Sequence, residues 1–281
     1  MNTTTTGRET IAAAFASSGK RAALMPYLMG GFPTLEGSRA IGEAYAEAGA
    51  DLVELGVPFS DPLADGPVIH AAGTAALEAG ATLHGVLEVG RALAESVPVV
   101  LMCYANLVLA RGPERFADEL AQRGVSGLIV PDLPMEEADG ALAACDAAGL
   151  ALVPLVAPTT PPERLAAIGA RARGFVYTVS VTGTTGERGA LAAGLSGVLA
   201  RTQAATDVPV ALGFGIGTPE AAAGAADAGA DGVIVGSRLV RAAAEAERPA
   251  DEVRALVAGF AEALRCSPDM DVRLPISPPS R

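Results

Sequence analysis

The stretch Ala46-Glu-Ala-Gly-Ala-Asp-Leu-Val-Glu-Leu-Gly56 joins the end of a helical pattern to the start of a buried strand. Nearly the same stretch returns as Ala226-Asp-Ala-Gly-Ala-Asp-Gly-Val-Ile-Val-Gly236. In both, an alanine-rich segment ends at a glycine, and an apolar run of strand length follows. This near-repeat predicts a chain built from alternating helices and parallel strands.

The same alternation runs from the first apolar segment to about residue 240. We expect strands at 22–29, 51–57, 98–104, 126–131, 150–156, 174–180, 208–213 and 231–236. Eight short strands, with helical segments between them and no linker, predict a single α/β domain folded as a closed (β/α)8 TIM barrel. An open doubly wound sheet is the alternative.

The two ends of the chain lie outside this alternation. An amphipathic pattern from Thr10 to Ser18 predicts an extra N-terminal helix before the first strand. Residues 267–281 are rich in proline, serine and charge, so we expect a frayed, disordered tail after a barrel that spans residues 1–266.

Composition limits the class of protein. Half of the 281 residues are apolar, no apolar run approaches the roughly 20 residues of a membrane span, and the polar start lacks a signal pattern, so we expect a cytoplasmic location. The formal charge of −12 argues against a nucleic-acid or anionic-membrane surface. Cys103, Cys145 and Cys266 are far apart and odd in number, which favours buried thiols over a disulfide framework or a metal site.

Scarce basic side chains exclude some mechanisms. Lys20 is the only lysine and lies in a polar turn, where it cannot form a Schiff base in a buried site. His70 and His84 are the only histidines, and both fall on helical stretches, so a metal-dependent aldolase is disfavoured.

Acidic residues gather in the run Glu54-Leu-Gly-Val-Pro-Phe-Ser-Asp-Pro-Leu-Ala-Asp-Gly-Pro67. In a strand, Glu54 shares a face with residues 52 and 56 and points into whatever the strand encloses. Burial of a carboxylate is costly and raises its pKa towards the range useful for acid-base catalysis. A buried ion pair is the alternative role for Glu54.

Two further acids follow the strand. Asp61 precedes Pro62 and could simply form a turn, and Asp65 could cap a helix that begins near Pro67. Both lie just beyond a strand end, where barrels of this fold build their active sites, so a functional role competes with each structural one.

Three glycine-rich segments predict a phosphate site late in the chain, at residues 182–186, 213–217 and 236–237. Backbone N–H groups and a helix opening near Leu239 could hold the anion, although each segment alone could be a tight turn. The candidates are Gly186, Gly213, Gly215, Gly236 and Ser237. Residues 182–190 are expected to form a lid, with a disordered loop as the alternative.

The run from Val53 to Pro67 resembles the α subunit of tryptophan synthase, and the resemblance extends over roughly residues 8 to 265. It includes 104–106, 131–134, Tyr177, 184–189 and 213–216, whereas Val181 stands where other members carry arginine. The resemblance implies cleavage of indole-3-glycerol phosphate into indole and glyceraldehyde 3-phosphate. It also implies a pyridoxal-phosphate β subunit that receives indole, in an α2β2 heterotetramer.

The resemblance also implies roles for particular residues. Glu54 and Asp65 would be the catalytic pair, acting without metal, Schiff base or any cofactor in this chain, and Asp61 and Asp132 would signal to the partner. The implied substrate contacts are Tyr27, Met102, Tyr104, Ile129, Val156, Tyr177, Thr185 and Phe214. A stand-alone indole-releasing lyase and a non-catalytic regulatory subunit are the alternatives; a ribose-type sugar-phosphate isomerase lacks support for its aspartate pair.

Overall fold

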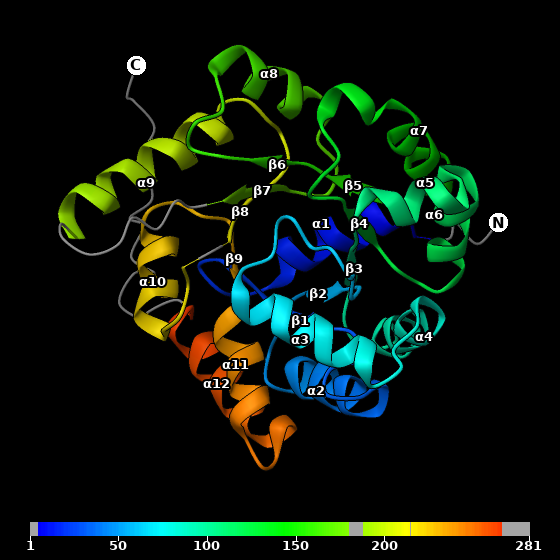
Figure 1. Ribbon diagram of the computed structural model, residues 1–281. Coiled ribbons are helices and arrows are strands. Elements are labelled where there is room, and N and C mark those ends of the chain that lie inside the picture. The colour runs from blue at the N-terminus through cyan, green and yellow to red at the C-terminus, as the bar shows by residue number, and fades with distance from the viewer. Residues whose placement is uncertain (1–4, 180–187, 214, 266–281) are drawn as a thin grey trace, which may run out of the picture.

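The computed structural model describes residues 5–179, 188–213 and 215–265. Its strands are all parallel and lie in one sheet of order β5-β4-β3-β2-β1-β9-β8-β7-β6, which curves into a ring (Figure 1). The strands are β1 Ala23–Met29, β2 Val53–Gly56, β3 Val99–Met102, β4 Gly127–Ile129, β5 Ala151–Val153, β6 Leu155–Val156, β7 Val176–Val179, β8 Val210–Gly213 and β9 Gly232–Val235.

The ring closes through a strand that is divided in two. β5 pairs with β4, β6 pairs with β7, and Pro154 alone separates β5 from β6. Proline has no N–H to donate to a sheet, so the strand changes partners there. Its carbonyl still accepts a 2.9 Å hydrogen bond from the N–H of Tyr177. The nine segments are therefore the eight predicted strands, and the predicted barrel is confirmed.

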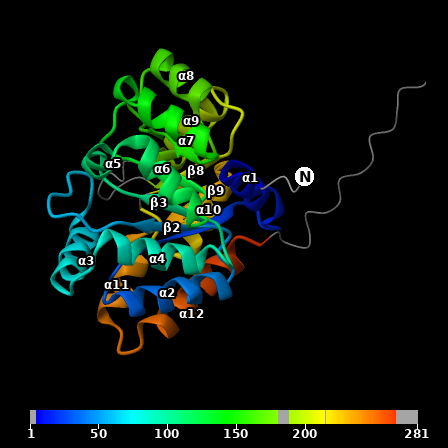
Figure 2. The same ribbon diagram turned by 90° about the vertical axis from the view of Figure 1, so that its right-hand side faces the viewer.

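Helices surround the ring on its outside, except for the first helix, which lies across one end of the ring, as Figures 1 and 2 show. They are α1 Gly7–Ser17, α2 Leu35–Glu47, α3 Pro67–Glu78, α4 Leu83–Leu93, α5 Ala105–Arg111, α6 Pro113–Gln122, α7 Asp139–Ala148, α8 Pro162–Arg171, α9 Arg188–Gln203, α10 Pro219–Asp227, α11 Ser237–Glu245 and α12 Pro249–Ala263, with a 3-10 turn η1 at Met135–Glu137. Within the described ranges, none of these helices has the length and apolar character needed to cross a membrane.

Apolar side chains form two layers because strand residues alternate between the two faces of the sheet. Val53 and Leu55 of β2 belong to the outer layer, between sheet and helices. Leu52 belongs to the inner layer, which fills the barrel together with Met25, Val100 and others. Glu54 shares the inward face with Leu52, as the sequence predicted.

The extra N-terminal helix closes the amino end of the barrel. α1 begins at Gly7, three residues before the predicted start, because Thr6 and Glu9 form a reciprocal capping box. Ile11 is fully buried in the inner layer, and the ring of Phe15 lies 5.8 Å from that of Phe175. α1 thus occupies the end of the barrel opposite the carboxyl ends of the strands.

The two near-repeats build the same strand start. The Asp51 carboxylate accepts a 2.7 Å hydrogen bond from the N–H of Leu24, and the Asp231 carboxylate accepts one of 2.8 Å from Val210. Each aspartate thereby ties its own strand to the preceding one. Lys20 donates to both oxygens of Asp51, so the single lysine stabilises the amino end of the barrel.

The described residues test the expectation for two of the three cysteines but not the one for the C-terminal tail. Cys103 and Cys145 are buried free thiols, as predicted. Cys266 and the tail 267–281 lie outside the described residues, so the domain boundary at 266 remains a prediction.

Candidate active site

A cavity of about 420 Å³ lies at the carboxyl ends of the strands and contains both candidate acids. Its lining is largely apolar, with polar groups concentrated on one side and at the mouth. The lining residues are Tyr27, Glu54, Ala64, Asp65, Gly66, Ile69, Met102, Tyr177, Gly215, Ile216, Gly217, Ile234, Gly236, Ser237, Arg238 and Arg241.

Glu54 is buried in this cavity without a hydrogen-bond partner. Its side chain comes from β2, the residue is 4% exposed, and neither carboxyl oxygen bonds to any described group. Burial, and then the charge of Asp65, raises the pKa of Glu54 to about 8. The structure therefore excludes the alternative of a buried ion pair within the described residues, and Glu54 carries a proton at neutral pH.

Two tyrosines narrow the cavity beside Glu54, and each lies against a glycine of the next strand. A Cβ atom on Gly56 would lie 2.0 Å from the Tyr27 hydroxyl oxygen, and one on Gly213 would lie 2.3 Å from that of Tyr177. Burial raises the pKa of both phenols well above its usual value, so both stay neutral. Any larger residue than glycine at positions 56 and 213 would occupy the space of the two tyrosine rings.

Asp65 lies on the loop after β2 and does not cap a helix. α3 begins at Pro67 with Gly66 as its N-cap and no side-chain cap, which excludes the capping role considered for Asp65. The Tyr104 hydroxyl accepts a 3.0 Å hydrogen bond from the N–H of Ala64 and donates to the Asp65 carboxylate. Tyr104 thus holds the loop that carries the second acid.

Opposing effects act on the pKa of Asp65. Partial burial raises it, and the Tyr104 hydrogen bond and the charge of His70 oppose that rise. The Phe59 ring lies 5.1 Å from the Tyr104 ring and covers the same loop. The two acids therefore differ, because Glu54 is buried without a partner and Asp65 is half-buried and hydrogen-bonded.

A helix N-terminus reaches the opposite side of the cavity. α11 begins at Ser237, two residues before the predicted start, and no side chain caps it. Gly215 has φ +79°, a conformation that favours glycine, and it lines the cavity with Gly236. Free N–H groups at a helix start form a site for an anion. Gly213 does not line the cavity; it lies against the Tyr177 ring and leaves room for it. Gly186 lies outside the described residues.

The remaining candidates for substrate contact divide into three groups. Tyr27, Met102 and Tyr177 line the cavity, and Tyr104 lies behind Asp65. Thr185 and Phe214 lie outside the described residues. Ile129 is fully buried in the inner layer and is not among the residues that line the cavity.

Val156 does not reach the cavity that holds Glu54. It belongs to the outer layer, and its neighbour Leu155 packs against the inner one. Alternation within a strand is the reason: Val153 faces inward, so Leu155 does too, and Val156 faces outward. The predicted substrate contact at Val156 placed the residue correctly near the carboxyl end of the barrel but on the wrong face of the sheet.

Asp61 and Asp132 lie exposed at the carboxyl end of the barrel. Asp61 accepts a hydrogen bond from the Ser60 hydroxyl, and Asp132 accepts a 2.8 Å hydrogen bond from the N–H of Ala105 at the start of α5. Asp61 is thus bound within its own loop, and Asp132 is bound to the start of α5. Their predicted role towards a partner stays a prediction.

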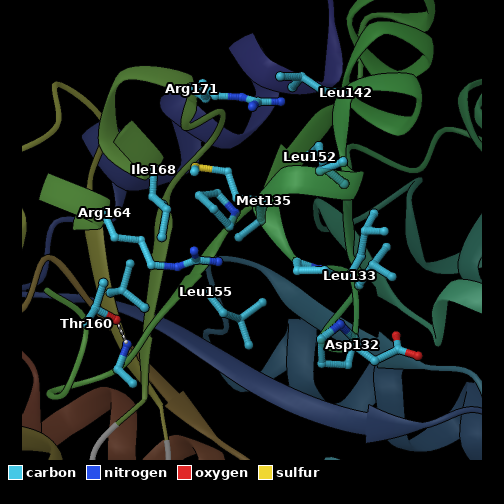
Figure 3. Close-up of a pocket in the computed structure, with 18 of the residues that line it drawn as sticks. Asp132, Leu133, Met135, Leu142, Leu152, Leu155, Thr160, Arg164, Ile168 and Arg171 are labelled. Atoms are coloured by element: carbon cyan, nitrogen blue, oxygen red, sulfur yellow. Dashed lines mark hydrogen bonds between the residues drawn. The ribbon is translucent and has the colours of Figure 1, made fainter. Parts of the chain in front are cut away.

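Figure 3 shows a second cavity, of about 630 Å³, beside Asp132. It opens where β4 and β6 part, and leucines form much of its wall. Its two arginines are already paired, Arg164 with Glu136 and Arg171 with Asp139. The third titratable residue of its described lining, Asp132, is exposed. A buried carboxyl group without a partner is present in the cavity of Glu54 and not in the described lining of this one.

Sequence reasoning missed several lining residues. Ile69 lies in the first turn of α3, and Arg238 and Arg241 lie on α11. A signal for the arginines was present, because cations at the start of a helix oppose its dipole. The apolar residues Ile216 and Ile234 carried no signal beyond their strand-end positions.

A protonated, buried carboxyl group and a second, hydrogen-bonded carboxyl group at the open end of a (β/α)8 barrel define an acid-base enzyme of the barrel class. The family model described as tryptophan synthase alpha chain matches residues 14–265. The chain belongs to the tryptophan synthase alpha chain family. The resemblance found in the sequence and the expected enzyme class, a lyase, are thereby confirmed.

Relatives cover most of the chain. The tryptophan synthase alpha chain of Prochlorococcus marinus (strain MIT 9313) is 49% identical over 228 residues, 80% of this chain and 83% of the relative. That of Methanosarcina mazei is 47% identical over 248 residues, 87% of this chain and 91% of the relative. A solved structure of Mycobacterium tuberculosis tryptophan synthase has a TM-score of 0.83 and 40% identity, and the match covers 92% of this chain and 98% of that one.

A pair of glycine substitutions separates the anion site from the packing of the tyrosines. A Cβ atom on Gly236 would meet only Tyr27 Cβ, at 3.7 Å, so Gly236→Ala should keep its thermal midpoint and lose affinity for glycerol phosphate. Gly213→Ala should lower both the thermal midpoint and the affinity for glycerol phosphate, because its methyl group would collide with Tyr177. Thermal unfolding and titration calorimetry measure the two effects, and undiminished binding by Gly236→Ala would place the anion elsewhere.

Proposed function

We propose that Glu54 and Asp65 together cleave indole-3-glycerol phosphate into indole and glyceraldehyde 3-phosphate. The observation that supports this most is the state of Glu54, a buried carboxyl group with no described partner and a pKa raised to about 8. A carboxyl group that keeps its proton at neutral pH can donate it to a carbon atom.

The reaction proceeds in two proton transfers. Glu54 first donates its proton to C3 of the indole ring, and the ionised Asp65 stabilises the positive charge that develops at the ring nitrogen. The Glu54 carboxylate then removes the proton of the adjacent glycerol hydroxyl group. The electrons of that O–H bond form the aldehyde, and the electrons of the breaking C–C bond neutralise the ring. Glu54 ends protonated again, so the cycle consumes no proton.

Substrate binding divides between the two sides of the cavity. The apolar side, with Tyr27, Met102 and Tyr177, suits the indole ring, and the N-terminus of α11 suits the phosphate group. Gly186, Thr185 and Phe214 remain part of this proposal on the resemblance alone.

The chain is further proposed to work with a tryptophan synthase β subunit in an α2β2 heterotetramer. The β subunit would bind pyridoxal phosphate and receive indole, and it would dock on the carboxyl face, where Asp61 and Asp132 are exposed. Covering that face would keep a small apolar intermediate from solvent. A cytoplasmic location belongs to the same proposal.

Removing either acid should abolish most of the activity. Glu54→Gln and Asp65→Asn are each expected to lower indole release at least about a hundredfold, because each removes one acid-base or electrostatic step. Initial rates with purified variants measure this, with circular dichroism to verify folding. Near wild-type turnover in either folded variant would contradict the mechanism and favour the regulatory-subunit alternative.

The pKa of Glu54 predicts how pH acts on activity and stability. kcat/KM should fall above about pH 8, as Glu54 loses the proton it donates. The folded state also holds this proton more tightly than the unfolded state, whose pKa is near 4.5, so the contribution of Glu54 to the free energy of unfolding falls as pH rises from about 4.5 to about 8.

Thermal unfolding of wild type, Glu54→Gln and an exposed control, Glu114→Gln, measures the stability effect. Glu54→Gln should lack that pH-dependent loss, and the control should follow wild type. Parallel curves for wild type and Glu54→Gln would show that the Glu54 carboxyl group is ordinary.

A β subunit and a substrate analogue should bind cooperatively. If β favours the substrate-binding conformation, linkage requires that an analogue in the barrel tighten β binding by the same factor by which β tightens the analogue. Titration calorimetry with a β subunit measures both factors. Equal β affinity with and without analogue, together with unchanged indole release on adding β, would support the stand-alone lyase.

A further inference from the structure

Two arginines stand at the mouth of the cavity without a described ion pair. Arg238 and Arg241 both line it, and they are three positions apart on α11, so they lie on one face of that helix. No ion pair among the described residues includes either side chain. On the next helix, α12, Arg254 pairs with Glu47 and Asp251. The two guanidinium groups are therefore available to an anion.

Their position opposes the local electrostatics of the helix. Arg238 is the second residue of α11, where the positive end of the dipole disfavours a cation. Arg115 of α6 and Arg164 of α8 also lie in a first turn, but each follows a glutamate, whereas the first turn of α11 has no acidic residue to offset Arg238. A residue that destabilises its own helix but lines a cavity is typical of a functional site.

The cavity itself points to a ligand. Glu54 is almost fully buried there, and both of its oxygens lack a described partner. With a formal charge of −12 over the chain and the carboxyl group of Asp65 in the cavity, a phosphate dianion would be repelled at long range. Guanidinium groups at the mouth reverse the sign of the field where the dianion must enter, and their planar donors match phosphate oxygens.

We infer that Arg238 and Arg241 capture the phosphate group of the substrate at the mouth of the barrel and hold it against the N-terminus of α11. The inference deepens the proposed function and rests on it for the identity of the substrate. Both side chains act at the phosphate, remote from the bond that breaks. Their loss should therefore raise KM and leave kcat nearly unchanged.

The kinetic test uses Arg238→Gln, Arg241→Gln and the double variant in the presence of saturating β subunit. Arg115→Gln is the matched control, because Arg115 on α6 is exposed, has no described ion pair and does not line the cavity. The double variant should raise KM about tenfold with kcat within about twofold of wild type, and the difference should shrink at high salt. The control should match wild type, and an unchanged KM in the double variant at low salt would overturn the inference.

Affinity measurements distinguish a failure of this inference from a failure of the proposed reaction. Glycerol 3-phosphate should bind the double variant about tenfold more weakly, and indole, which has no phosphate, should bind it as tightly as wild type. If wild type released no indole but bound glycerol 3-phosphate through these arginines, the reaction would be wrong and the anion site would stand. Equal affinity of wild type and double variant for glycerol 3-phosphate would overturn the inference whatever the activity.

Thermal unfolding excludes a purely structural role. Because the arginines oppose the helix dipole, the double variant should unfold no lower than wild type. A lower thermal midpoint, with equal losses of indole and glycerol 3-phosphate affinity, would assign the arginines to packing and overturn the inference.

Discussion

A carboxyl group held in an apolar barrel without a hydrogen-bond partner is the constraint on which the site depends. Glu54 can have a pKa near 8 only while the surrounding wall keeps water and compensating donors away from it. The two apolar layers, one inside the ring and one under the helices, provide that rigidity. The same burial that costs stability makes Glu54 a proton donor at neutral pH.

Tyrosines and glycines define the shape around this carboxyl group. Tyr27 and Tyr177 each lie over a glycine at the carboxyl end of the following strand, and both phenols are close enough to Glu54 to interact with its charge. At the other end of the barrel, α1 and its buried Ile11 fill the space between the strands. One end therefore stabilises the barrel, and the other contains the chemistry, a division common to this fold.

Charge in this protein is arranged on two scales. The chain as a whole is acidic, which suits a small substrate and a protein partner better than nucleic acid. At the cavity, the N-terminus of α11 and the two inferred phosphate-capturing arginines oppose that overall charge.

The sequence by itself determined the alternation of helices and strands, the barrel and the inward direction of Glu54, because these follow from local periodicity and residue type. It also indicated Asp65, although its capping role was excluded only by the observed start of α3. Tertiary structure alone decided where the ring closes, at Pro154, and which residues meet across strands. The Tyr104 contact with Asp65 and the burial of Ile129 depend on strand pairing and register, which bring together residues far apart in the chain and leave no trace in the sequence around either of them.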